Sequence, residues 1–240
     1  MIAAIAMIIM HYGFGFVYID ENMSKHIIWL QIILTLFSIF VIKKFSTWKK
    51  SGFDKLDLKG FLWILPSFIF MGAYLVIMAL NFKGTLSQAS IDVATSTAIL
   101  LLFVGFAEET MFRGILLNWS LEKYGKNKAI FISSIGFALL HVANILGGEP
   151  LGAVWSQVFD TFLNGVFMAI IVLKMKNIIP AMILHFLWDF TILFTNTLVE
   201  AGNLPTNLTQ YLIGEYVYEK LIAAVYFIYL LWKFYKKRRK

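Results

Sequence analysis

The chain has 240 residues, of which 60% are hydrophobic and 15% are charged, and its formal net charge at pH 7 is +7. Its mean hydropathy of +0.76 lies far above the range of soluble globular domains, which excludes a soluble enzyme or a soluble binding domain. The chain has no cysteine, so disulfides, thiol nucleophiles and thiolate metal sites are excluded as well.

Eight apolar stretches separated by short polar breaks follow one another along the chain. A helix needs roughly 20 apolar residues to cross a hydrocarbon layer of about 30 Å. Helices are expected because a backbone in lipid must satisfy its own hydrogen bonds, and no stretch alternates as a barrel strand does. We therefore predict an all-α, polytopic membrane helix bundle with about eight transmembrane helices, forming a single domain over residues 1–240. The predicted spans are 1–19, 26–42, 61–80, 93–122, 129–146, 153–173, 178–198 and 216–233.

The first stretch, 1–19, lacks the basic start and the small-residue cleavage site of a signal peptide, so we expect a retained helix.

Two polar residues in the apolar stretches have simple structural interpretations. His11 lies among apolar residues of the first stretch, where a packed histidine is more common than a metal ligand. Asp160, with Asn164 one helical turn later, could face a polar cavity, but a structural hydrogen bond is the favoured interpretation.

Lysine residues gather in every second break between the predicted spans and in the C-terminal sequence KKRRK. The breaks after spans two, four and six contain Lys43, Lys44, Lys49, Lys50, Lys55, Lys59, Lys123, Lys126, Lys128, Lys174 and Lys176. These segments share one membrane face, and the positive-inside rule predicts that this face and both termini are cytoplasmic. Topology and attraction to anionic lipid explain the positive charge, so no nucleic-acid partner is expected. The longest polar break, residues 43–60, is expected to lie along the inner membrane surface.

Six ionisable side chains lie away from the ends of three of the predicted spans. They are Glu108, Glu109 and Arg113 in 93–122, His141 in 129–146, and His185 and Asp189 in 178–198. Such groups are costly in a bilayer and usually mark a functional site. Counted from the basic ends of their spans, at about 1.5 Å per residue, they lie at depths of roughly 14 to 22 Å. Three helices therefore place polar groups in one layer of the membrane.

Spacing along the helices separates the roles of these residues. Glu109 and Arg113 are four residues apart, so they share a helix face and can neutralise each other. Glu108 is rotated away from this pair, has no cation on its own helix, and is the candidate for chemistry. His185 and Asp189 are also four residues apart and share a face.

Other classes of protein also bury charged groups in a membrane. A non-catalytic polar network would only fix how the helices pack. A proton-coupled transporter would use intramembrane carboxylates and histidines, but the chain shows no repeat between its halves and no paired spans broken by Gly or Pro. Glu108, His141, His185 and Asp189 could also hold a zinc ion with an open position, although the sequence HExxH is absent.

Three short motifs carry these residues in a recognisable order. EETMFRG covers residues 108–114, FALLH covers 137–141 with Phe137 and His141 on one helix face, and HFLWD covers 185–189. They resemble Glu-Glu-x-x-x-Arg, Phe-x-x-x-His and His-x-x-x-Asn/Asp, the motifs of the CPBP family of CAAX protease and bacteriocin-processing membrane enzymes. The resemblance covers about residues 93–198, which would form the catalytic core.

The resemblance implies an intramembrane endopeptidase in which Glu108 is the general base that activates a water molecule. His141 would help to hold that water, and His185 with Asp189 would provide donors toward the developing oxyanion. Amide hydrolysis needs both effects, and both become stronger where water is scarce. This mechanism needs no metal, so a metal-free enzyme is favoured over one that uses a divalent metal such as zinc.

The implied supporting residues are Glu109 and Arg113, which would fix the position of Glu108. Asp189 departs from the pattern, because many relatives have Asn there. An ionised carboxylate cannot donate to an oxyanion, so Asp189 would have to be protonated or would have to orient His185.

The implied substrate is a membrane-associated peptide or protein. A chain rich in Ile, Phe and Lys and without Cys is typical of a low-GC bacterium, where prenylated CaaX substrates are not expected. Some bacterial relatives act in bacteriocin self-immunity or in processing secreted peptides, and this is the biology we expect, in the bacterial cell membrane. The competing hypothesis is a non-catalytic immunity or scaffold protein whose polar pocket binds a peptide or a receptor. The sequence leaves the oligomeric state open.

Overall fold

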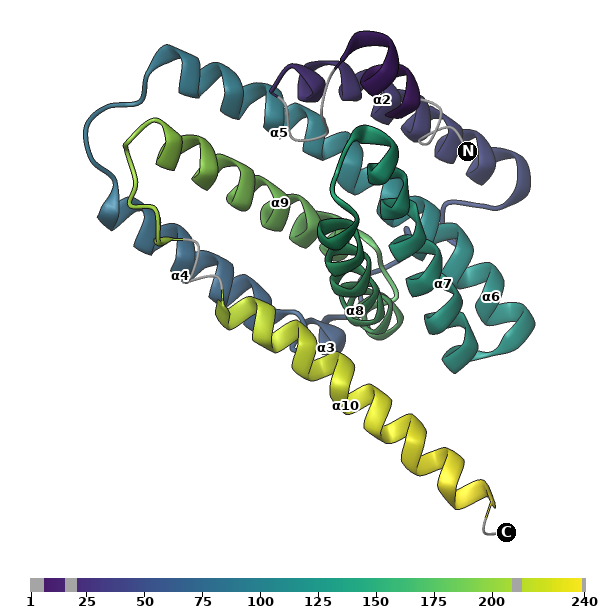
Figure 1. Cartoon of the computed structure of the whole chain (residues 1–240). Helices are drawn as coiled ribbons and strands as arrows, with labels where there is room; N and C mark the ends of the chain where they lie inside the picture. The colour runs from purple at the N-terminus through teal and green to yellow at the C-terminus, as the bar shows by residue number, and fades with distance from the viewer. Residues whose placement is uncertain (1–6, 16–20, 209–212, 239–240) are drawn as a thin grey trace.

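A computed structural model of the chain describes residues 7–15, 21–208 and 213–238. Within these ranges the fold is built from helices, which confirms the all-α prediction (Figure 1). The described residues also contain an isolated antiparallel β-bridge between Phe53 and Asn177.

The helices follow one another in an order close to the predicted one. They are η1 (Ile9–Gly13), α2 (Glu21–Phe45), α3 (Leu58–Phe61), α4 (Leu65–Asn81), α5 (Gln88–Glu109), η2 (Thr110–Leu116), α6 (Leu117–Tyr124), α7 (Lys126–Leu140), η3 (His141–Gly147), α8 (Leu151–Met175), α9 (Ile179–Glu200) and α10 (Ile213–Arg238). Here η1 and η2 are π-helices, and η3 is a 3₁₀-helix.

Five helices in the described part of the chain are long and apolar enough to cross a membrane. They are Ile27–Phe45, Gln88–Tyr124, Lys126–Gly147, Leu151–Met175 and Ile179–Glu200. The predicted span 61–80 corresponds to α4, a shorter apolar helix of 17 residues, and 216–233 corresponds to α10, which is not among the five. The predicted span 1–19 lies partly outside the described residues. The structure thus supports five spans, and the predicted count of eight is not confirmed.

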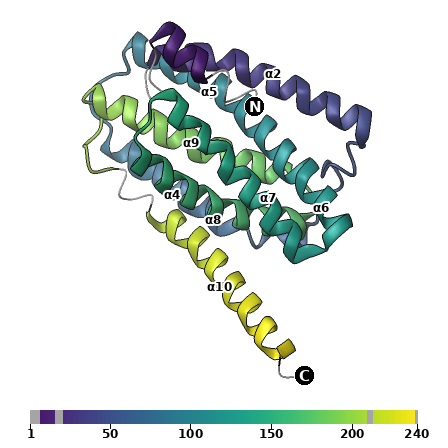
Figure 2. The ribbon, with the colours of Figure 1, turned by 45° about the vertical axis from the view of Figure 1, so that its right-hand side comes forward.

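Helix α8 lies at the centre of the bundle. It packs against α7 on one side and α10 on another, while α5 packs between α2 and α9 (Figures 1 and 2). Every residue from Gly165 to Val172 is buried, as expected for a stretch that is apolar all round. Helix α10 extends away from the bundle beyond its contacts with α4 and α8 (Figure 2).

Helices α5, η2 and α6 form one continuous helix of 37 residues, Gln88–Tyr124. At about 1.5 Å per residue it is longer than a hydrocarbon layer of about 30 Å, so it extends beyond that layer or tilts within it. The helix begins at the cap residue Ser87, whose side chain accepts from the backbone N–H of Ser90, and it ends at Gly125, where φ is +78°. It changes from α to π geometry directly after Glu109, so the predicted site lies at its main irregularity.

A non-helical segment between α2 and α3, residues 46–57, crosses the turn between α8 and α9, and we call it the strap. The backbone N–H of Ile178 donates to the carbonyl of Gly52 at 3.0 Å, and the N–H of Asp57 donates to the carbonyl of Met175 at 2.9 Å. Gly52 has a φ of +85°, and a Cβ there would lie 2.5 Å from the side chain of Ile178. Both facts require glycine, so the strap is a defined structure rather than a loose loop.

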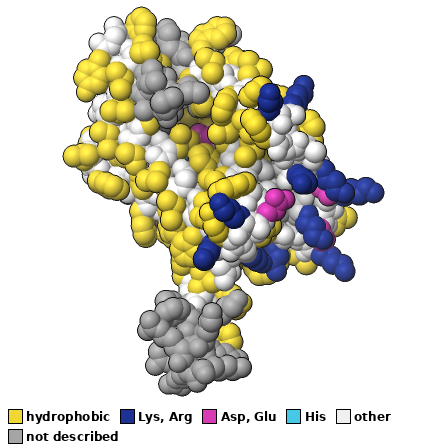
Figure 3. Space-filling model, turned by 90° about the vertical axis from the view of Figure 1, so that its right-hand side faces the viewer, with side chains coloured by type: hydrophobic (Ala, Val, Ile, Leu, Met, Phe, Trp, Pro, Cys, Tyr) yellow, Lys and Arg dark blue, Asp and Glu magenta, His cyan; other side chains and the backbone are white. Residues whose placement is uncertain are grey.

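Lysine side chains gather on one side of the face drawn in Figure 3, and hydrophobic side chains cover much of the rest. We call the end of the bundle that carries the lysine-rich segments 43–60, 123–128 and 174–176 the basic end. Two of its lysines lie over aromatic rings: Lys123 is 5.1 Å from the ring of Trp119, and Lys174 is 4.8 Å from that of Trp63. Aromatic and basic residues of this kind are typical of the boundary between hydrocarbon and water. The segregation of basic residues predicted from the sequence is therefore present in three dimensions.

Candidate active site

Three helices meet at the candidate site, and two of them change their geometry there. The chain passes from α5 to η2 directly after Glu109, and from α7 to the 3₁₀-helix η3 at His141. Helix α9 remains regular through His185 and Asp189. A change of helix type alters the direction of the following side chains, and π segments are frequent at functional sites.

Glu109 and Arg113 form the buried base of the site. Their Oε1 and Nη1 atoms are 2.7 Å apart, and both side chains are fully buried, which confirms the pair predicted from the spacing. The Arg113 guanidinium also lies 4.1 Å from the centre of the Phe137 ring, a cation–π contact between η2 and α7. Because each charge compensates the other, the pair can exist where a single ion would be prohibitive.

His185 joins this pair from α9. Its Nδ1 lies 3.0 Å from Oε1 of Glu109, the same oxygen that accepts from Arg113. An ionised carboxylate only accepts hydrogen bonds, so Nδ1 of His185 must carry the proton. The other ring nitrogen, Nε2, faces Asp189 Oδ2 at 3.3 Å and Glu108 Oε2 at 3.9 Å. The imidazole of His185 therefore lies between three carboxyl groups.

Glu108 differs from its neighbour in both exposure and partners. Its side chain is 12% exposed, whereas that of Glu109 is completely buried. Glu108 faces His185 across 3.9 Å, and Arg113 pairs with Glu109 instead. Glu108 is thus the carboxylate of the two that is partly exposed and that does not pair with Arg113.

Phe137 connects His141 to the rest of the site. The Phe137 ring meets the His141 ring edge-to-face, with centroids 5.2 Å apart, and meets the His185 ring in the same way at 6.0 Å. Nδ1 of His141 lies 3.1 Å from the carbonyl of Phe137, so Nδ1 donates and Nε2 of the neutral ring is left as an acceptor. The structure thereby brings His141 to the same cluster, through an aromatic ring rather than a direct polar contact.

Exposure increases across the site in one direction. Arg113 and Glu109 have no exposed side-chain surface, His185 is 12% exposed, and Asp189 is 33% exposed. The Asp189 end of the cluster is therefore its most exposed part, and the Glu109–Arg113 pair is its most buried part.

Two polar side chains that were not expected from the sequence support the π-helical turn. The Asn118 side-chain amide donates to the carbonyls of Arg113 and Gly114, at 3.2 and 2.9 Å, and the Ser133 hydroxyl on α7 donates to that of Phe112 at 2.9 Å. These bonds satisfy carbonyls that a regular helix would bond within its own backbone. The position of Asn118, one helical turn after the first motif, could have indicated its role from the sequence. No feature of the sequence indicated the role of Ser133.

The strap reaches the site from the basic end. A Cβ on Gly114, next to Arg113, would lie 2.9 Å from the backbone carbonyl oxygen of Ser51. The Phe53 ring, also in the strap, lies 6.1 Å from that of Phe106, just before the glutamates. The glycine that ends the first motif is therefore required for close packing of the strap against the site.

Several buried polar atoms of the site have no hydrogen-bond partner among the described residues. They are Oε2 of Glu109, Nε and Nη2 of Arg113, and the hydroxyl of Thr110. Unsatisfied buried groups lower stability by about 1–3 kcal/mol each, and more when they are charged. These atoms concentrate buried polarity where α5 passes into η2.

A shared metal position is not evident in this arrangement. In the described part of the chain, no three His, Cys, Asp or Glu side chains are placed to hold one metal ion together. This holds also for the four possible ligands predicted from the sequence, Glu108, His141, His185 and Asp189.

The two isolated polar residues have the structural roles that the sequence suggested. His11 packs against Gly148, where an added Cβ would lie 2.7 Å from the imidazole. Asp160 forms an ion pair of 2.9 Å with Lys220, and the Asn164 amide donates to Glu219 at 2.9 Å. Both of these polar contacts join α8 to α10.

Residues 90–191 match a family model described as Type II CAAX prenyl endopeptidase Rce1-like. No curated protein and no solved structure matches the chain. The matched segment contains all three motifs and runs from α5 into α9. The match confirms the resemblance that the motifs suggested: this segment is similar to the CAAX family of membrane endopeptidases.

Proposed function

We propose that the chain is an intramembrane endopeptidase of the glutamate type, which hydrolyses a peptide bond in a membrane-associated peptide or protein. The observation that supports this proposal most directly is that two adjacent carboxylates differ in exposure and in their partners. Glu109 is completely buried and neutralised by Arg113, whereas Glu108 is partly exposed and lies beside His185. A general base needs free acceptor capacity and access to water, and Glu108 has both.

In this mechanism a water molecule donates one proton to Glu108 and the other to Nε2 of His141. The carbonyl of Phe137 supports this role of His141, because it occupies Nδ1 and leaves Nε2 as an acceptor. The water oxygen then has a lone pair directed at the substrate carbonyl carbon. Glu108 takes up the proton as the carbon–oxygen bond forms, and returns it to the nitrogen when the carbon–nitrogen bond breaks.

The oxyanion of the tetrahedral intermediate would receive a hydrogen bond from Nε2 of His185. Since Nδ1 already donates to Glu109, His185 can donate from both nitrogens only as an imidazolium. The carboxylates of Glu109 and Asp189 on its two sides stabilise that form. Asp189 then positions and stabilises His185 rather than donating itself, which accounts for its departure from the Asn of many relatives.

The biology we propose is self-immunity against a bacteriocin or processing of a secreted peptide, in a bacterial cell membrane with both termini cytoplasmic. The competing function is a non-catalytic immunity or scaffold protein that uses the same pocket for binding. The two differ in one respect: catalysis needs the Glu108 carboxylate as a base, whereas binding needs only a side chain of similar shape.

The test compares peptide termini in membranes and medium from cells that carry the wild type, Glu108→Gln or Glu122→Gln at matched expression. Glu122 is exposed on α6 of the same continuous helix, so this control removes one carboxylate without touching the site. We expect a new terminus in the wild type and in Glu122→Gln, and its absence in Glu108→Gln. Equal termini in all three strains, with all three proteins folded, would favour the binding function.

Metal dependence is tested with the same samples. We expect the new terminus to survive a strong chelator, because the glutamate mechanism requires no ion. If the chelator removes the terminus and zinc restores it, the metal-free mechanism is wrong and the four candidate ligands become the zinc site.

A further inference from the structure

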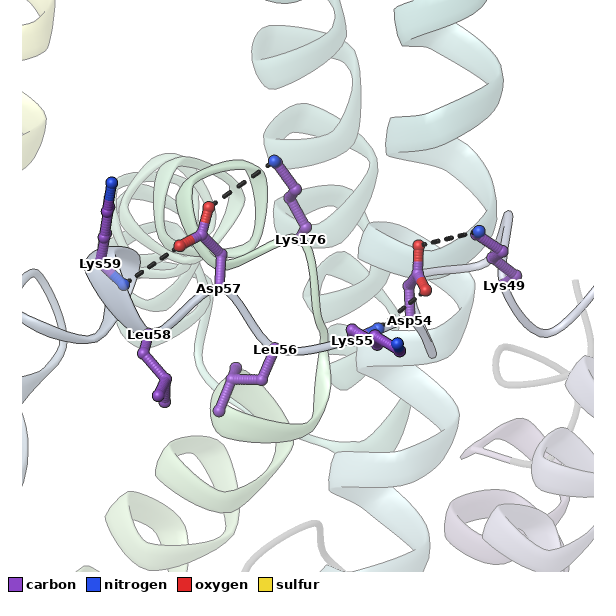
Figure 4. Close-up of a pocket in the computed structure, with 8 residues that line it drawn as sticks. All are labelled: Lys49, Asp54, Lys55, Leu56, Asp57, Leu58, Lys59 and Lys176. Atoms are coloured by element: carbon purple, nitrogen blue, oxygen red, sulfur yellow. Dashed lines mark hydrogen bonds and ion pairs between the residues drawn. The ribbon is translucent and has the colours of Figure 1, made fainter.

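The strap and the start of α3 carry charged and apolar side chains in alternation. Lys55, Asp57 and Lys59 alternate with Leu56 and Leu58, which are 39% and 73% exposed. Figure 4 shows the two leucines on the opposite side of this segment from Lys59 and from the contact between Asp57 and Lys176. Leu56 and Leu58 thus share one side of this segment and Asp57 and Lys59 the other, which suits the boundary between hydrocarbon and lipid headgroups.

A pocket of about 600 Å³ lies along this segment (Figure 4). It is lined by Lys49, Asp54, Lys55, Leu56, Asp57, Leu58, Lys59 and Lys176. Four lysines face two aspartates, so the lining has a net positive charge. The pocket lies at the basic end of the bundle, where Lys174 covers the ring of Trp63.

Both aspartates of the pocket are already engaged. Asp54 faces Lys49 at 3.7 Å and accepts from the backbone N–H of Lys55 at 2.8 Å. Asp57 faces Lys176 at 3.6 Å and accepts from the backbone N–H of Lys59 at 3.1 Å. Among the described residues, the ammonium groups of Lys55 and Lys59 have no carboxylate within ion-pair distance.

The backbone of the strap is held in place before any ligand arrives. Its bonds to Met175 and Ile178, and that of the Asn177 side chain to the carbonyl of Asp54, attach it to the turn between α8 and α9. A site fixed in this way loses less conformational freedom when it binds a ligand than a loose loop would.

We infer that this pocket binds the phosphate of an anionic membrane phospholipid, with Lys55 and Lys59 as the principal cationic contacts and with Leu56 and Leu58 against its acyl chains. The lysines supply charge for an anionic headgroup, and the leucines supply the contact that a soluble phosphate could not use. A headgroup without net charge would gain little from the pair. The site is separate from the proposed catalytic groups.

The experiment measures binding of short-chain phosphatidylglycerol, short-chain phosphatidylcholine and glycerol 1-phosphate to the purified full chain in detergent, by native mass spectrometry. The test variant is Lys55→Gln/Lys59→Gln. The control is Lys126→Gln/Lys128→Gln, which removes two lysines from the same basic end, outside the pocket. Neither pair belongs to the proposed catalytic site, so the measurement does not depend on proteolysis.

We expect phosphatidylglycerol to bind more tightly than the other two ligands, and the test variant to weaken its binding by roughly one order of magnitude. The control should change binding by less than about threefold, as expected for diffuse attraction alone. A Leu56→Ser/Leu58→Ser variant should weaken phosphatidylglycerol and leave glycerol 1-phosphate unchanged.

Three outcomes would overturn the inference. Equal losses in the test and control variants would mean that the basic end attracts lipid only through its total charge. Equal binding of the two lipids would mean that the headgroup charge is not recognised. Binding of glycerol 1-phosphate as tight as that of phosphatidylglycerol would indicate a site for a soluble phosphate.

Discussion

The chain carries ion pairs in two settings that differ mainly in their exposure to solvent. In the site, Glu109 and Arg113 approach to 2.7 Å with both side chains fully buried. In the strap, Lys49 and Asp54 approach to 3.7 Å with side chains 77% and 37% exposed. Water and salt can replace a lost partner in the strap but not in the site.

This difference implies different purposes for the two pairs. An exposed pair contributes little to stability, so its charges remain available to a ligand such as a lipid headgroup. A buried pair lets one helix carry two charges into the interior, because each charge compensates the other and losing either partner leaves a charge without compensation. Substitutions in the two settings should therefore differ in how much stability they remove and in how salt changes that loss.

The greatest loss is expected from Arg113→Met, which leaves Glu109 without its cation. We expect a loss of about 3–5 kcal/mol of unfolding free energy, the usual result of breaking a buried pair. The measurement is thermal or denaturant unfolding of the purified protein in detergent micelles.

The double variant Glu109→Leu/Arg113→Met is the control for that prediction. It removes both charges and should recover most of the lost stability, since apolar residues often replace a buried pair without net cost. A double variant that is less stable than Arg113→Met would contradict the argument that the unpaired charge is the cause.

A smaller loss is expected from Gly114→Ala, where the strap meets the site. The new Cβ would lie 2.9 Å from the backbone oxygen of Ser51, so one of the two segments must shift, at about 1–3 kcal/mol. Gly72→Ala in α4 is the control, because no atom lies within 4 Å of its Cβ position. There alanine should stabilise the helix by about 0.5–1 kcal/mol. Opposite signs of the two changes in unfolding free energy support the contact, and equal signs count against it.

Local features of the site could be predicted from the sequence because helix geometry is local. Four residues bring two side chains onto one face, and this spacing was sufficient to pair Glu109 with Arg113. The three helices could be grouped into one layer because the rise per residue is constant. The helical class of the whole fold was predictable because a backbone in lipid must satisfy its own hydrogen bonds.

Contacts between helices were not predictable in the same way. The bond between His185 and Glu109 depends on how α9 is rotated against α5, and the packing of the whole bundle decides that rotation. The change of helix type at His141 and the contact of Ser51 with Gly114 likewise depend on distant segments. The predicted count of eight spans was not confirmed, because α4 is shorter and α10 is less apolar than the five clear spans.

Phe137→Leu should have an intermediate effect, because this ring touches all three helices of the site. The variant loses the cation–π contact with Arg113 and both histidine contacts, and we expect a loss of about 1–2 kcal/mol of unfolding free energy. Phe131→Leu, on the same helix, loses ring contacts to Phe162 and Phe227 without a cation. The difference between the losses in Phe137→Leu and Phe131→Leu measures the contribution of the cation–π contact with Arg113. Equal losses would mean that this contact contributes no stability.

The least change is expected from Lys49→Gln in the strap. This variant breaks a charge pair just as Arg113→Met does, but the remaining carboxylate of Asp54 is partly exposed and keeps the backbone N–H of Lys55 at 2.8 Å. Water can therefore solvate it, and the unfolding free energy in lipid-free micelles should change by less than about 1 kcal/mol. High salt should abolish even that change, because it screens an exposed pair, whereas the loss caused by Arg113→Met should persist. A loss from Lys49→Gln that is large and insensitive to salt would mean that the strap is buried against another surface, and the distinction between a fixed internal pair and an available external one would no longer hold.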